Sequence, residues 1–510
     1  MGRPILCCNS PPPRYEGTPS MNEIRKPRAQ IDLVGGTWKE PRLRLGATLD
    51  DPNTGAPRQE QLATDPQEVE NALGAAEALH RSGVWASVPV QTRVDLLDLV
   101  ADGLVQRIDE LGHEDAMATG NPLGVATMMA SFLGPRVRSA RDQLLEVGTS
   151  TPLPAGARDV RLLRRPIGPA VVIAPWNAPT FVGVAKVASA LAAGCPVILK
   201  PSEWAPAGCQ IVAEVIEAAI DELALPAAVF QLVHGAAEVG AQLVSDPRVR
   251  AISFTGGGNG GRAVAVAAAP HFTALQLELG GHNPAIVMRD ADIPKAAAAI
   301  AEGMTKLNGQ WCEAPGKVMV DGSRHDELVE ALFEELGRKR VGHCLDKASE
   351  VGPLAHASHL DHLQRRVDEL ADAGGKALSN SSLPDLDGWF FAPTVVVGAA
   401  AERSTRELFG PVVSVHSVSS SEEALQASYG PETGLAGFVF GSDLDEAMDL
   451  GSRMPAGEVR INGCKLADLA DGSEQEFWNN AGIGAHGPTD MVRFFQARQT
   501  VGVDDPALPI

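Results

Sequence analysis

A cysteine that stands behind a glycine and a glutamine is the first candidate for chemistry in this sequence. Residues 308–312 read Asn-Gly-Gln-Trp-Cys, and residues 313–316 read Glu-Ala-Pro-Gly. A thiolate is a strong nucleophile, and covalent catalysis often uses one cysteine on a tight turn. Gly309 allows a sharp turn, and Gln310 offers amide dipoles nearby. Because most lone cysteines are inert core residues, Cys312 needs support from the rest of the chain.

Two further polar residues could assist such a nucleophile. Asn177 lies in the string Pro-Trp-Asn-Ala-Pro at residues 175–179, where two prolines stiffen the loop. A fixed amide N–H can stabilise an oxyanion, although Asn and Pro also favour plain turns. Glu278 lies in an apolar strand before Gly280 and Gly281. Burial would raise its pKa and make it a base near neutrality; the alternative is an edge carboxylate in an ion pair.

A glycine-rich string offers a phosphate site. Residues 256–261 read Gly-Gly-Gly-Asn-Gly-Gly, after a predicted strand and before a predicted helix. Backbone amides and a helix N-terminus there could bind a pyrophosphate. Glu278 then falls near the spacing, about 20 residues on, at which an acidic residue grips a ribose in dinucleotide-binding proteins. That fingerprint belongs to the first strand of a sheet and this strand is the fourth, so we favour the other interpretation of Glu278.

Residues 200–203, Lys-Pro-Ser-Glu, offer a better ribose site directly after the buried run 196–199. The Glu203 carboxylate could accept both hydroxyls of an adenine ribose and would repel a 2′-phosphate, which favours NAD over NADP. The plainer interpretation is a solvated Lys-Glu pair on a loop.

These candidates lie where strands should end. After Pro166 the sequence alternates, with predicted strands at 170–174, 196–200, 229–233 and 249–254 and predicted helices at 181–193, 205–223, 237–244 and 260–268. Such alternation predicts an α/β fold with a Rossmann-like, doubly wound parallel sheet that binds ligands at the carboxyl ends of its strands. Asn177, Lys200 and Gly256 fall at those ends.

The remaining segments are less regular. Residues 31–38 predict a short strand with a turn, and residues 69–81 and 94–111 predict helices. A second α/β segment spans about 284–462, with its clearest helices at 292–305 and 326–338. Residues 491–503 read as a strand without a neighbour in sequence. The exposed strand at 160–163 is its candidate partner, in the same chain or across a subunit boundary.

Composition limits the partners. Acidic residues number 64 against 43 basic ones, which gives a formal net charge of -21, so nucleic acid and anionic membranes are repelled. No run of about 18 apolar residues could span a bilayer. The seven cysteines are odd in number and mostly scattered, which favours reduced thiols in the cytoplasm over disulfides or a metal site.

Taken together, the candidate strings resemble the aldehyde dehydrogenase superfamily in their order and spacing across about residues 30 to 503. The matching strings are Pro-Trp-Asn at 175–177, Lys-Pro-Ser-Glu at 200–203, Phe-Thr-Gly at 254–256, Glu-Leu-Gly-Gly at 278–281, Gly-Gln-x-Cys at 309–312, Glu-Leu-Phe-Gly-Pro at 407–411 and Gly-Leu-Ala-Gly at 434–437.

The resemblance implies a mechanism. Cys312 would attack the aldehyde carbonyl, with the oxyanion held by Asn177 and the backbone N–H of Cys312. Hydride transfer to NAD would leave a thioester, Glu278 would activate water to release the acid, and Lys186 would help to relay protons. No metal is implied. The residues implied to hold NAD are Ile173, Trp176, Lys200, Ser202, Glu203, Gly256, Gly257, Gly261, Leu279, Glu407 and Phe409.

Several positions depart from the family pattern. Gly257 stands where Ser is usual, His282 where Lys is usual, and Thr305 where an apolar residue is usual. Glu313 follows the nucleophile in place of a small residue, and its charge would raise the pKa of Cys312. His486 occupies a place often held by Glu in a proton path.

The resemblance also implies an organisation: a disordered N-terminal tail at 1–28, an NAD-binding domain at 29–145 and 164–278, a catalytic domain at 279–480, and a small β arm for oligomerisation at 146–163 and 487–510. We expect a cytoplasmic homodimer or homotetramer that oxidises a small aldehyde. Small Ala178 and large Trp311 suit a medium apolar or aromatic aldehyde. The alternatives are a CoA-acylating relative, against which Glu278 argues, and a non-catalytic protein on the same scaffold.

Overall fold

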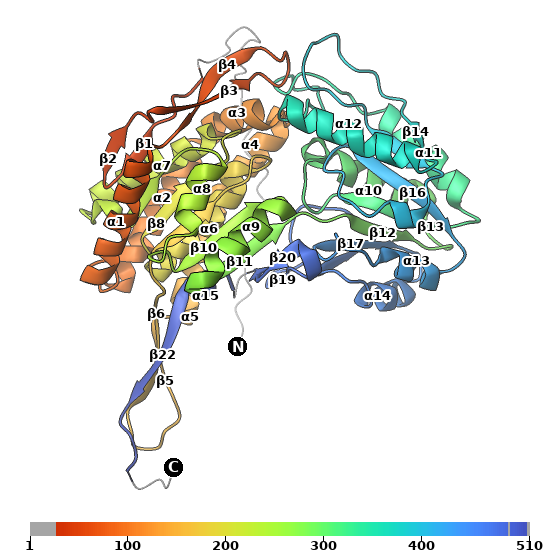
Figure 1. The fold of residues 1–510 in the computed structure, drawn as a ribbon. Helices are drawn as coiled ribbons and strands as arrows, with labels where there is room; N and C mark the ends of the chain where they lie inside the picture. Colours follow the sequence, from red (N-terminus) through yellow and green to blue (C-terminus); the bar gives the residue numbers. More distant parts are fainter. Residues whose placement is uncertain (1–26, 488–489, 507–510) are drawn as a thin grey trace.

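The computed structural model describes residues 27–487 and 490–506, and their fold is mixed α/β (Figure 1). Of the predicted tail at 1–28, residues 1–26 therefore lie outside the described residues. Within the described part, Arg28 forms ion pairs with Glu110 and Glu214, so this end of the tail is packed against the body. No helix of the described residues is long and apolar enough to cross a membrane.

The first lobe is built on a sheet with the strand order β2-β1-β9-β8-β7-β10-β11-β20. The run β9-β8-β7-β10-β11 is parallel, which confirms the predicted doubly wound sheet, and β1, β2 and β20 pair antiparallel with their neighbours. These strands are β1 (Asp32–Val34), β2 (Thr37–Lys39), β7 (Ala170–Ile173), β8 (Val197–Lys200), β9 (Phe230–Leu232), β10 (Ala251–Gly256), β11 (Ala274–Leu279) and β20 (Gly482–Ile483).

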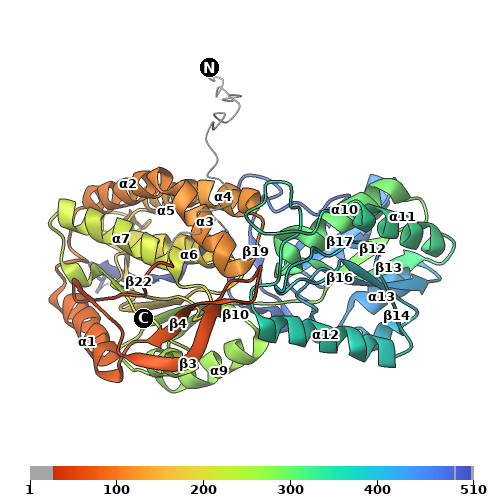
Figure 2. The same ribbon diagram turned by 90° about the horizontal axis from the view of Figure 1, so that it is seen from above.

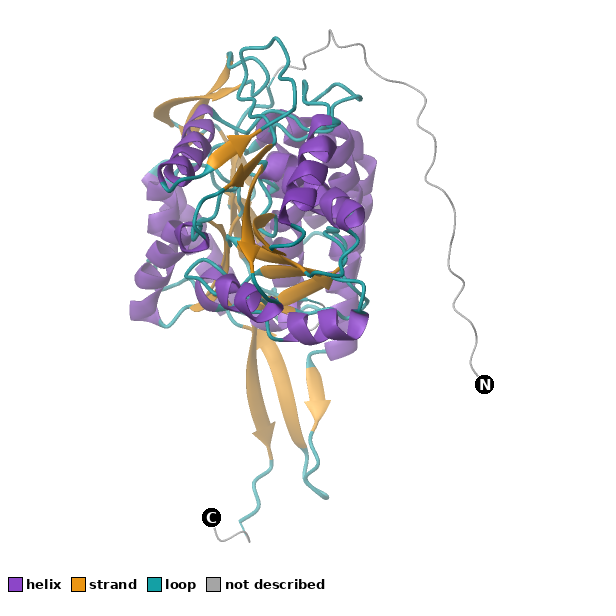
Figure 3. Cartoon of the chain, turned by 90° about the vertical axis from the view of Figure 1, so that its right-hand side faces the viewer, coloured by secondary structure: helices purple, strands orange, loops and turns teal. Residues whose placement is uncertain are grey.

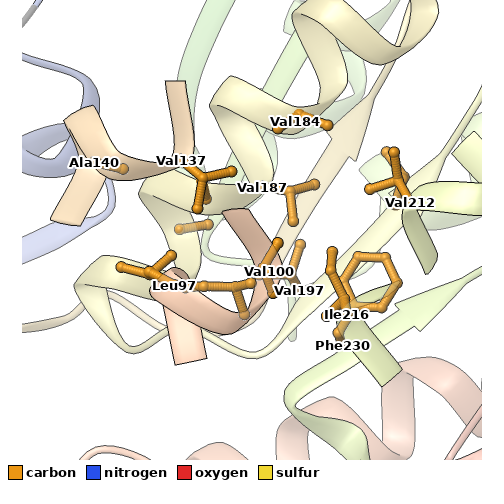
Figure 4. Packing of buried hydrophobic residues seen from close by; sticks show 14 of the residues in the cluster. Leu97, Val100, Val137, Ala140, Val184, Val187, Val197, Val212, Ile216 and Phe230 are labelled. Carbon is orange, nitrogen blue, oxygen red and sulfur yellow. The ribbon is translucent and has the colours of Figure 1, made fainter. Parts of the chain in front are cut away.

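Helices cover both faces of this sheet. Along β7 the side chains alternate, so that Ala170 and Val172 pack on one layer and Val171 and Ile173 on the other. Figure 4 shows apolar residues of the first layer, where α2, α5, α6 and α7 meet the sheet. The helices of this lobe are α1 (Pro66–Ser82), α2 (Val90–Gln106), α3 (Ile108–Thr119), α4 (Leu123–Ser131), α5 (Leu133–Val147), α6 (Pro179–Ala193), α7 (Ala207–Glu222), α8 (Ala237–Val244) and α9 (Gly258–Ala268).

One predicted helix, at 94–111, is instead two helices. Arg107 leaves the helical conformation between α2 and α3, with φ −110° and ψ 14°. Its guanidinium pairs with Glu110 of α3 and Glu214 of α7, so a tertiary ion-pair cluster holds the break that the apolar spacing alone does not reveal.

The second lobe lies beside the first (Figure 2) and confirms the predicted second α/β segment. Its strand order is β14-β15-β16-β13-β12-β17-β18, parallel except for β14. Its elements are β12 (Asn283–Val287), α10 (Ile293–Thr305), β13 (Pro315–Asp321), α11 (His325–Gly337), α12 (Ala357–Asp372), β14 (Lys376–Leu378), β15 (Thr394–Val397), β16 (Val412–Val418), α13 (Ser421–Ser428), β17 (Ala436–Phe440), α14 (Leu444–Ser452) and β18 (Glu458–Ile461).

A narrow β arm projects from the first lobe (Figures 1 and 3), with the strand order β22-β6-β5. It consists of β5 (Ser150–Pro152), β6 (Val160–Pro166) and β22 (Gln496–Gly502). The predicted strand at 491–503 is wrong at its start, because Asp490–Phe494 forms α15 and buries Met491 and Val492. The strand that follows pairs with β6 of the same chain, from Gln496 opposite Pro166 to Gly502 opposite Val160.

Short pieces complete the chain. The strands β3 (Leu43–Asp50) and β4 (Pro57–Ala63) form a hairpin, and β19 (Gln475–Glu476) pairs with β21 (Ala485–His486). The chain leaves the first lobe after β11 and returns as β20, which pairs with Leu277 and Glu278. Both sides of β11 are therefore occupied, so Glu278 is not on a sheet edge.

Candidate active site

A single large cavity of about 2080 Å³ joins the carboxyl ends of the first sheet to the second lobe. Pockets for one small molecule measure about 300–1,000 Å³, so this cavity has room for a dinucleotide together with a substrate. It is lined by every site residue expected from the sequence except Gly261: Ile173, Trp176, Asn177, Lys186, Lys200, Ser202, Glu203, Gly256, Gly257, Glu278, Leu279, Cys312, Glu407 and Phe409.

Gly261 corrects the expected set. It lies inside α9 rather than on the cavity wall, and a β-carbon there would stand 2.4 Å from the side chain of Leu279. The third glycine of the string therefore lets α9 approach β11.

Cys312 follows a strained turn that ends the short helix Lys306–Gly309. Leu307, Asn308 and Gly309 have φ of 51°, 58° and 74°, in the left-handed region that disfavours side chains. A β-carbon on Gly309 would stand 2.0 Å from the carbonyl carbon of Gly410. The turn predicted at Gly309 is confirmed, and close packing against the loop at Gly410 requires glycine.

Buried amides hold this turn in place. The side chain of Asn308 donates to the carbonyls of Gly120 and Pro353, at 2.8 and 2.9 Å, and accepts from the backbone N–H of Gly352. Gln310 donates to Thr119 and accepts from Ala355. The amide of Gln310 thus fixes the backbone before Cys312 and does not line the cavity.

Asn177 lies just before α6 and reaches the same turn. Its Nδ2 donates to the carbonyl oxygen of Gln310 at 2.8 Å, and its own carbonyl accepts from Asn121. An amide nitrogen has two N–H donors, so the second remains available beside Cys312. The arrangement can place an N–H donor next to an oxygen bound at the cysteine.

Glu278 lies next to the nucleophile. Its Oε1 lies 3.7 Å from Sγ of Cys312. Its Oε2 lies 3.8 Å from Nζ of Lys186, 3.7 Å from Nδ1 of His486 and 3.4 Å from Oγ1 of Thr255. The carboxylate is buried, and Lys186 and His486 share one of its oxygens while the other oxygen faces the thiol.

The far end of the cavity presents the groups expected to hold a dinucleotide. Lys200 is buried at the end of β8, and Ser202 donates to the carboxylate of the partly exposed Glu203 at 3.3 Å. Gly257 precedes α9, and nothing lies within 4 Å of the position of a β-carbon there. The open space and the free helix N-terminus suit a phosphate group.

Glu407 and Phe409 line the same cavity. Glu407 accepts a hydrogen bond from the backbone N–H of Gly281 at 3.1 Å, and burial raises its pKa to about 8. Phe409 has φ 52°, and its ring stands edge-on to Trp176, with 5.3 Å between centroids. Its carbonyl lies 2.7 Å from Nε2 of His359, a contact that holds the strained backbone.

Comparison with known proteins agrees with this geometry. The sequence profile described as the aldehyde dehydrogenase family matches residues 45–501. The chain is 33% identical to geranial dehydrogenase from Castellaniella defragrans over 443 residues, which cover 84% of this chain and 90% of that protein. It is 33% identical to vanillin dehydrogenase from Amycolatopsis over 439 residues, which cover 85% of this chain and 88% of that protein.

The chain belongs to the aldehyde dehydrogenase family. It is therefore an oxidoreductase that acts on aldehydes. A solved structure agrees: a point mutant of betaine aldehyde dehydrogenase from Staphylococcus aureus, in complex with NAD+, is similar with a TM-score of 0.88 and 26% identity. That match covers 94% of this chain and 99% of the other.

The charge state of Glu278 in this aldehyde dehydrogenase differs from the expectation. Burial alone raises the pKa of its carboxyl, but the hydrogen bond and charge of His486 and the charge of Lys186 outweigh burial and lower the pKa to about 2. The raised pKa predicted from the apolar strand is therefore wrong, because residues distant in sequence bring cations to the carboxylate. Glu278 is ionised at neutral pH and can accept a proton without first losing one.

Lys186 and Cys312 respond to the same surroundings. Burial lowers the pKa of Lys186 to about 8, although Glu278 acts in the opposite direction. Burial and the charges of Glu278, Glu313 and Glu407 raise the pKa of Cys312 well above its usual value. The thiol is therefore protonated at neutral pH before ligands bind.

Glu313 offers a test of this electrostatic effect. Replacing Glu313 with Gln removes one of the negative charges that raise the pKa of Cys312, so the thiolate fraction at a given pH increases. We expect iodoacetamide to alkylate Cys312 several-fold faster, with the rate-versus-pH curve shifted to lower pH, as followed by mass spectrometry of the Cys312 peptide. The control is Glu476→Gln, which changes the exposed residue next to Gln475. Equal rates in both variants would contradict the effect.

Two departures from the family pattern leave the cavity chemistry intact. His282 is buried away from the cavity, with Nε2 2.9 Å from Oγ of Ser404, and burial lowers its pKa to about 3. Thr305 lines the cavity, and its hydroxyl donates to the carbonyl of Ala301 at 2.6 Å. The Gly257 position has room for a side chain, as described above.

Two residues of the site were not predicted from the sequence. Asn283 donates to the carbonyls of Cys312 and Ala314, at 2.8 and 2.9 Å, and so fixes the backbone after the nucleophile. An amide two residues after the string Glu-Leu-Gly-Gly was a signal that could have found it. Arg136 lines the cavity from α5, and no motif or spacing marks it.

Proposed function

We propose that this aldehyde dehydrogenase oxidises an aldehyde to a carboxylic acid with NAD, through a thioester on Cys312. The observation that carries this function is the 3.7 Å separation between the Glu278 carboxylate and the Cys312 thiol, in a cavity that continues to Lys200 and Glu203. Assaying NADH formation with a panel of aldehydes tests it. No NADH with any aldehyde would refute it.

The residues would divide the chemistry as follows. Cys312 loses its proton to solvent, and its sulfur bonds to the carbonyl carbon, while the N–H groups of Asn177 and of Cys312 itself stabilise the alkoxide. NAD, when bound, supplies the hydride acceptor. Glu278 then takes a proton from water, whose oxygen bonds to the thioester carbonyl, and the carbon–sulfur bond breaks to release the acid. Lys186 and His486 lie at the other oxygen of this carboxylate, where a side chain that has first released its own proton can take the one held by Glu278.

The position of Glu278 favours water as the acyl acceptor. A base beside the thiol would serve no purpose if CoA took the acyl group, so the CoA-acylating alternative is disfavoured. A non-catalytic scaffold has no use for a strained cysteine turn held by buried amides. The named substrates of the relatives, geranial, vanillin and betaine aldehyde, differ widely and do not fix the substrate of this chain.

The choice of NAD over NADP rests on Glu203. Its carboxylate would accept the ribose hydroxyls and repel a 2′-phosphate, and a like charge at an interface costs several kcal/mol. We expect kcat/KM to favour NAD, and Glu203→Gln to reduce that preference by about tenfold or more, equal to about 1.4 kcal/mol per tenfold change. Kinetics with each cofactor at one aldehyde concentration measure it. A wild-type preference for NADP would contradict the assignment.

The β arm at 146–163 and 487–510 is proposed as the oligomerisation element. The other two proposed units are an NAD-binding domain at 29–145 and 164–278 and a catalytic domain at 279–480. Among the described residues no strand pairs with the outer edges of β5 and β22, and exposed edges favour pairing with another chain. We expect light scattering to give two or four times the chain mass of 53.5 kDa. A monomer at all concentrations would contradict this.

The proposed location is the cytoplasm. The cysteines of the described residues are all free thiols, as a reducing compartment requires: Cys195, Cys209, Cys312, Cys344 and Cys464.

A further inference from the structure

An unpaired arginine faces the cavity that holds Cys312. Arg136 lines this cavity from α5, and its guanidinium lies over the ring of Phe181, 3.7 Å from the ring centroid. Phe181 packs against the apolar wall formed by Ala178 and Trp311, which Cys312 also contacts. The guanidinium is thus held at the substrate end of the cavity, on the same wall as the nucleophile.

No described residue accepts a hydrogen bond from this guanidinium or pairs with it. Three other cationic groups of the cavity have partners: Lys186 pairs with Glu278, Arg460 with Glu458 and the carbonyl of Ala467, and Lys306 donates to the carbonyl of Cys464. Arg136 carries five N–H donors, and only the face of Phe181 compensates its charge at close range.

An unpaired cation in a partly buried site is unfavourable. Burial lowers the pKa of Arg136, and the charges of Asp468, Glu278 and Glu313 act in the opposite direction. Glu278 is already shared by two cations, and Arg460 and His486 act on Glu313. Asp468 is exposed and is the competing partner that any test must separate from a ligand.

We propose that Arg136 binds a carboxylate at the end of the substrate remote from the aldehyde. The guanidinium presents a planar fork of parallel N–H donors that match a carboxylate. Its position over Phe181 fixes the plane of this fork. The apolar wall of Ala178, Trp311 and Phe181 would then contact the middle of the molecule. The substrate class is an aldehyde acid with an apolar or aromatic spacer. This inference rests on the proposed oxidation at Cys312.

The test compares aldehydes that differ only in the remote group. 4-Carboxybenzaldehyde is paired with 4-methylbenzaldehyde, and straight-chain aldehydes with a terminal carboxylate are paired with methyl-terminated ones of equal length. For wild type we expect a higher kcat/KM for the carboxylated member of at least one pair. In Arg136→Met the ratio within that pair should fall by about ten- to a hundredfold, the range of a hydrogen bond to a charged group. Arg136→Lys, which keeps charge without the planar fork, should recover part of the ratio.

Two further variants serve as controls. Arg138→Met removes an arginine of the same helix that pairs with Asp102 outside the cavity, and should leave the ratio unchanged. Asp468→Asn removes the competing carboxylate and should raise the ratio. If Asp468→Asn lowers this kcat/KM ratio as Arg136→Met does, Arg136 acts by holding the loop at Asp468, and the proposal is overturned.

The outcomes separate this inference from the proposed function. If no aldehyde of either series yields NADH, the oxidation itself fails. If methyl-terminated aldehydes are oxidised but wild type shows no preference for any carboxylated member, or Arg136→Met leaves the ratio unchanged, only the role of Arg136 is refuted.

Discussion

Replacing Cys312 with alanine is expected to abolish aldehyde oxidation while leaving NAD binding intact. The cysteine would form the covalent intermediate, so its loss should lower kcat/KM by at least about 10⁴-fold. NAD binding should persist because the substitution changes none of the groups proposed to hold it, such as Lys200 and Glu203. Steady-state NADH formation and cofactor titration by fluorescence measure the two effects.

The other described cysteines provide the control. Cys209 and Cys344 are buried and do not line the cavity, so an aldehyde bound there does not reach their thiols. Cys344→Ala should keep its activity apart from a packing cost. Appreciable oxidation by Cys312→Ala, or loss of activity in Cys344→Ala without loss of stability, would overturn the assignment of the nucleophile.

Replacing Glu278 with glutamine is expected to stop turnover after one round. Attack by Cys312 and hydride transfer need no water, so NADH should form in a burst comparable to the concentration of active sites. Hydrolysis of the thioester would then lack its base, and kcat should fall by about 10²- to 10⁴-fold. Removal of the Glu278 charge also lowers the pKa of Cys312, so the burst itself should not be slowed. Stopped-flow absorbance of NADH resolves both phases.

The ribose interpretation of Glu278 predicts a different trace. A carboxylate that grips NAD would, when lost, raise the KM for NAD and leave the later steps unchanged. The structure places Glu278 beside Cys312, Lys186 and His486 rather than at the far end of the cavity with Glu203. A greatly raised KM for NAD without a burst would restore the ribose interpretation.

Much of this site was predictable because its residues occur in short strings at the ends of regular elements. The alternation of strands and helices after Pro166 placed Asn177, Lys200 and Gly256 at one edge, and the structure has them lining one cavity. The glycine of the Gly-Gln-x-Cys string predicted the turn before Cys312, which its left-handed backbone confirms.

What the sequence could not predict depends on partners that are distant along the chain. The pKa of Glu278 is set by His486 and Lys186, whose approach requires both the return of the chain as β20 and the position of α6. The break at Arg107 follows from an ion-pair cluster that includes Glu214. The proposed role of Arg136 follows from the absence of a partner for its guanidinium among the described residues. No pattern in the sequence can show that absence.

Intact-mass spectrometry of Glu278→Gln tests the central claim most directly. The variant is mixed with NAD and an aldehyde that wild type oxidises, quenched in acid after the NADH burst, and digested to locate any adduct. We expect a mass increase equal to one acyl group, two hydrogens less than the aldehyde adduct, on the peptide that contains Cys312. Unmodified protein after a full burst, or an acyl group on another cysteine, would contradict a thioester on Cys312 that waits for Glu278.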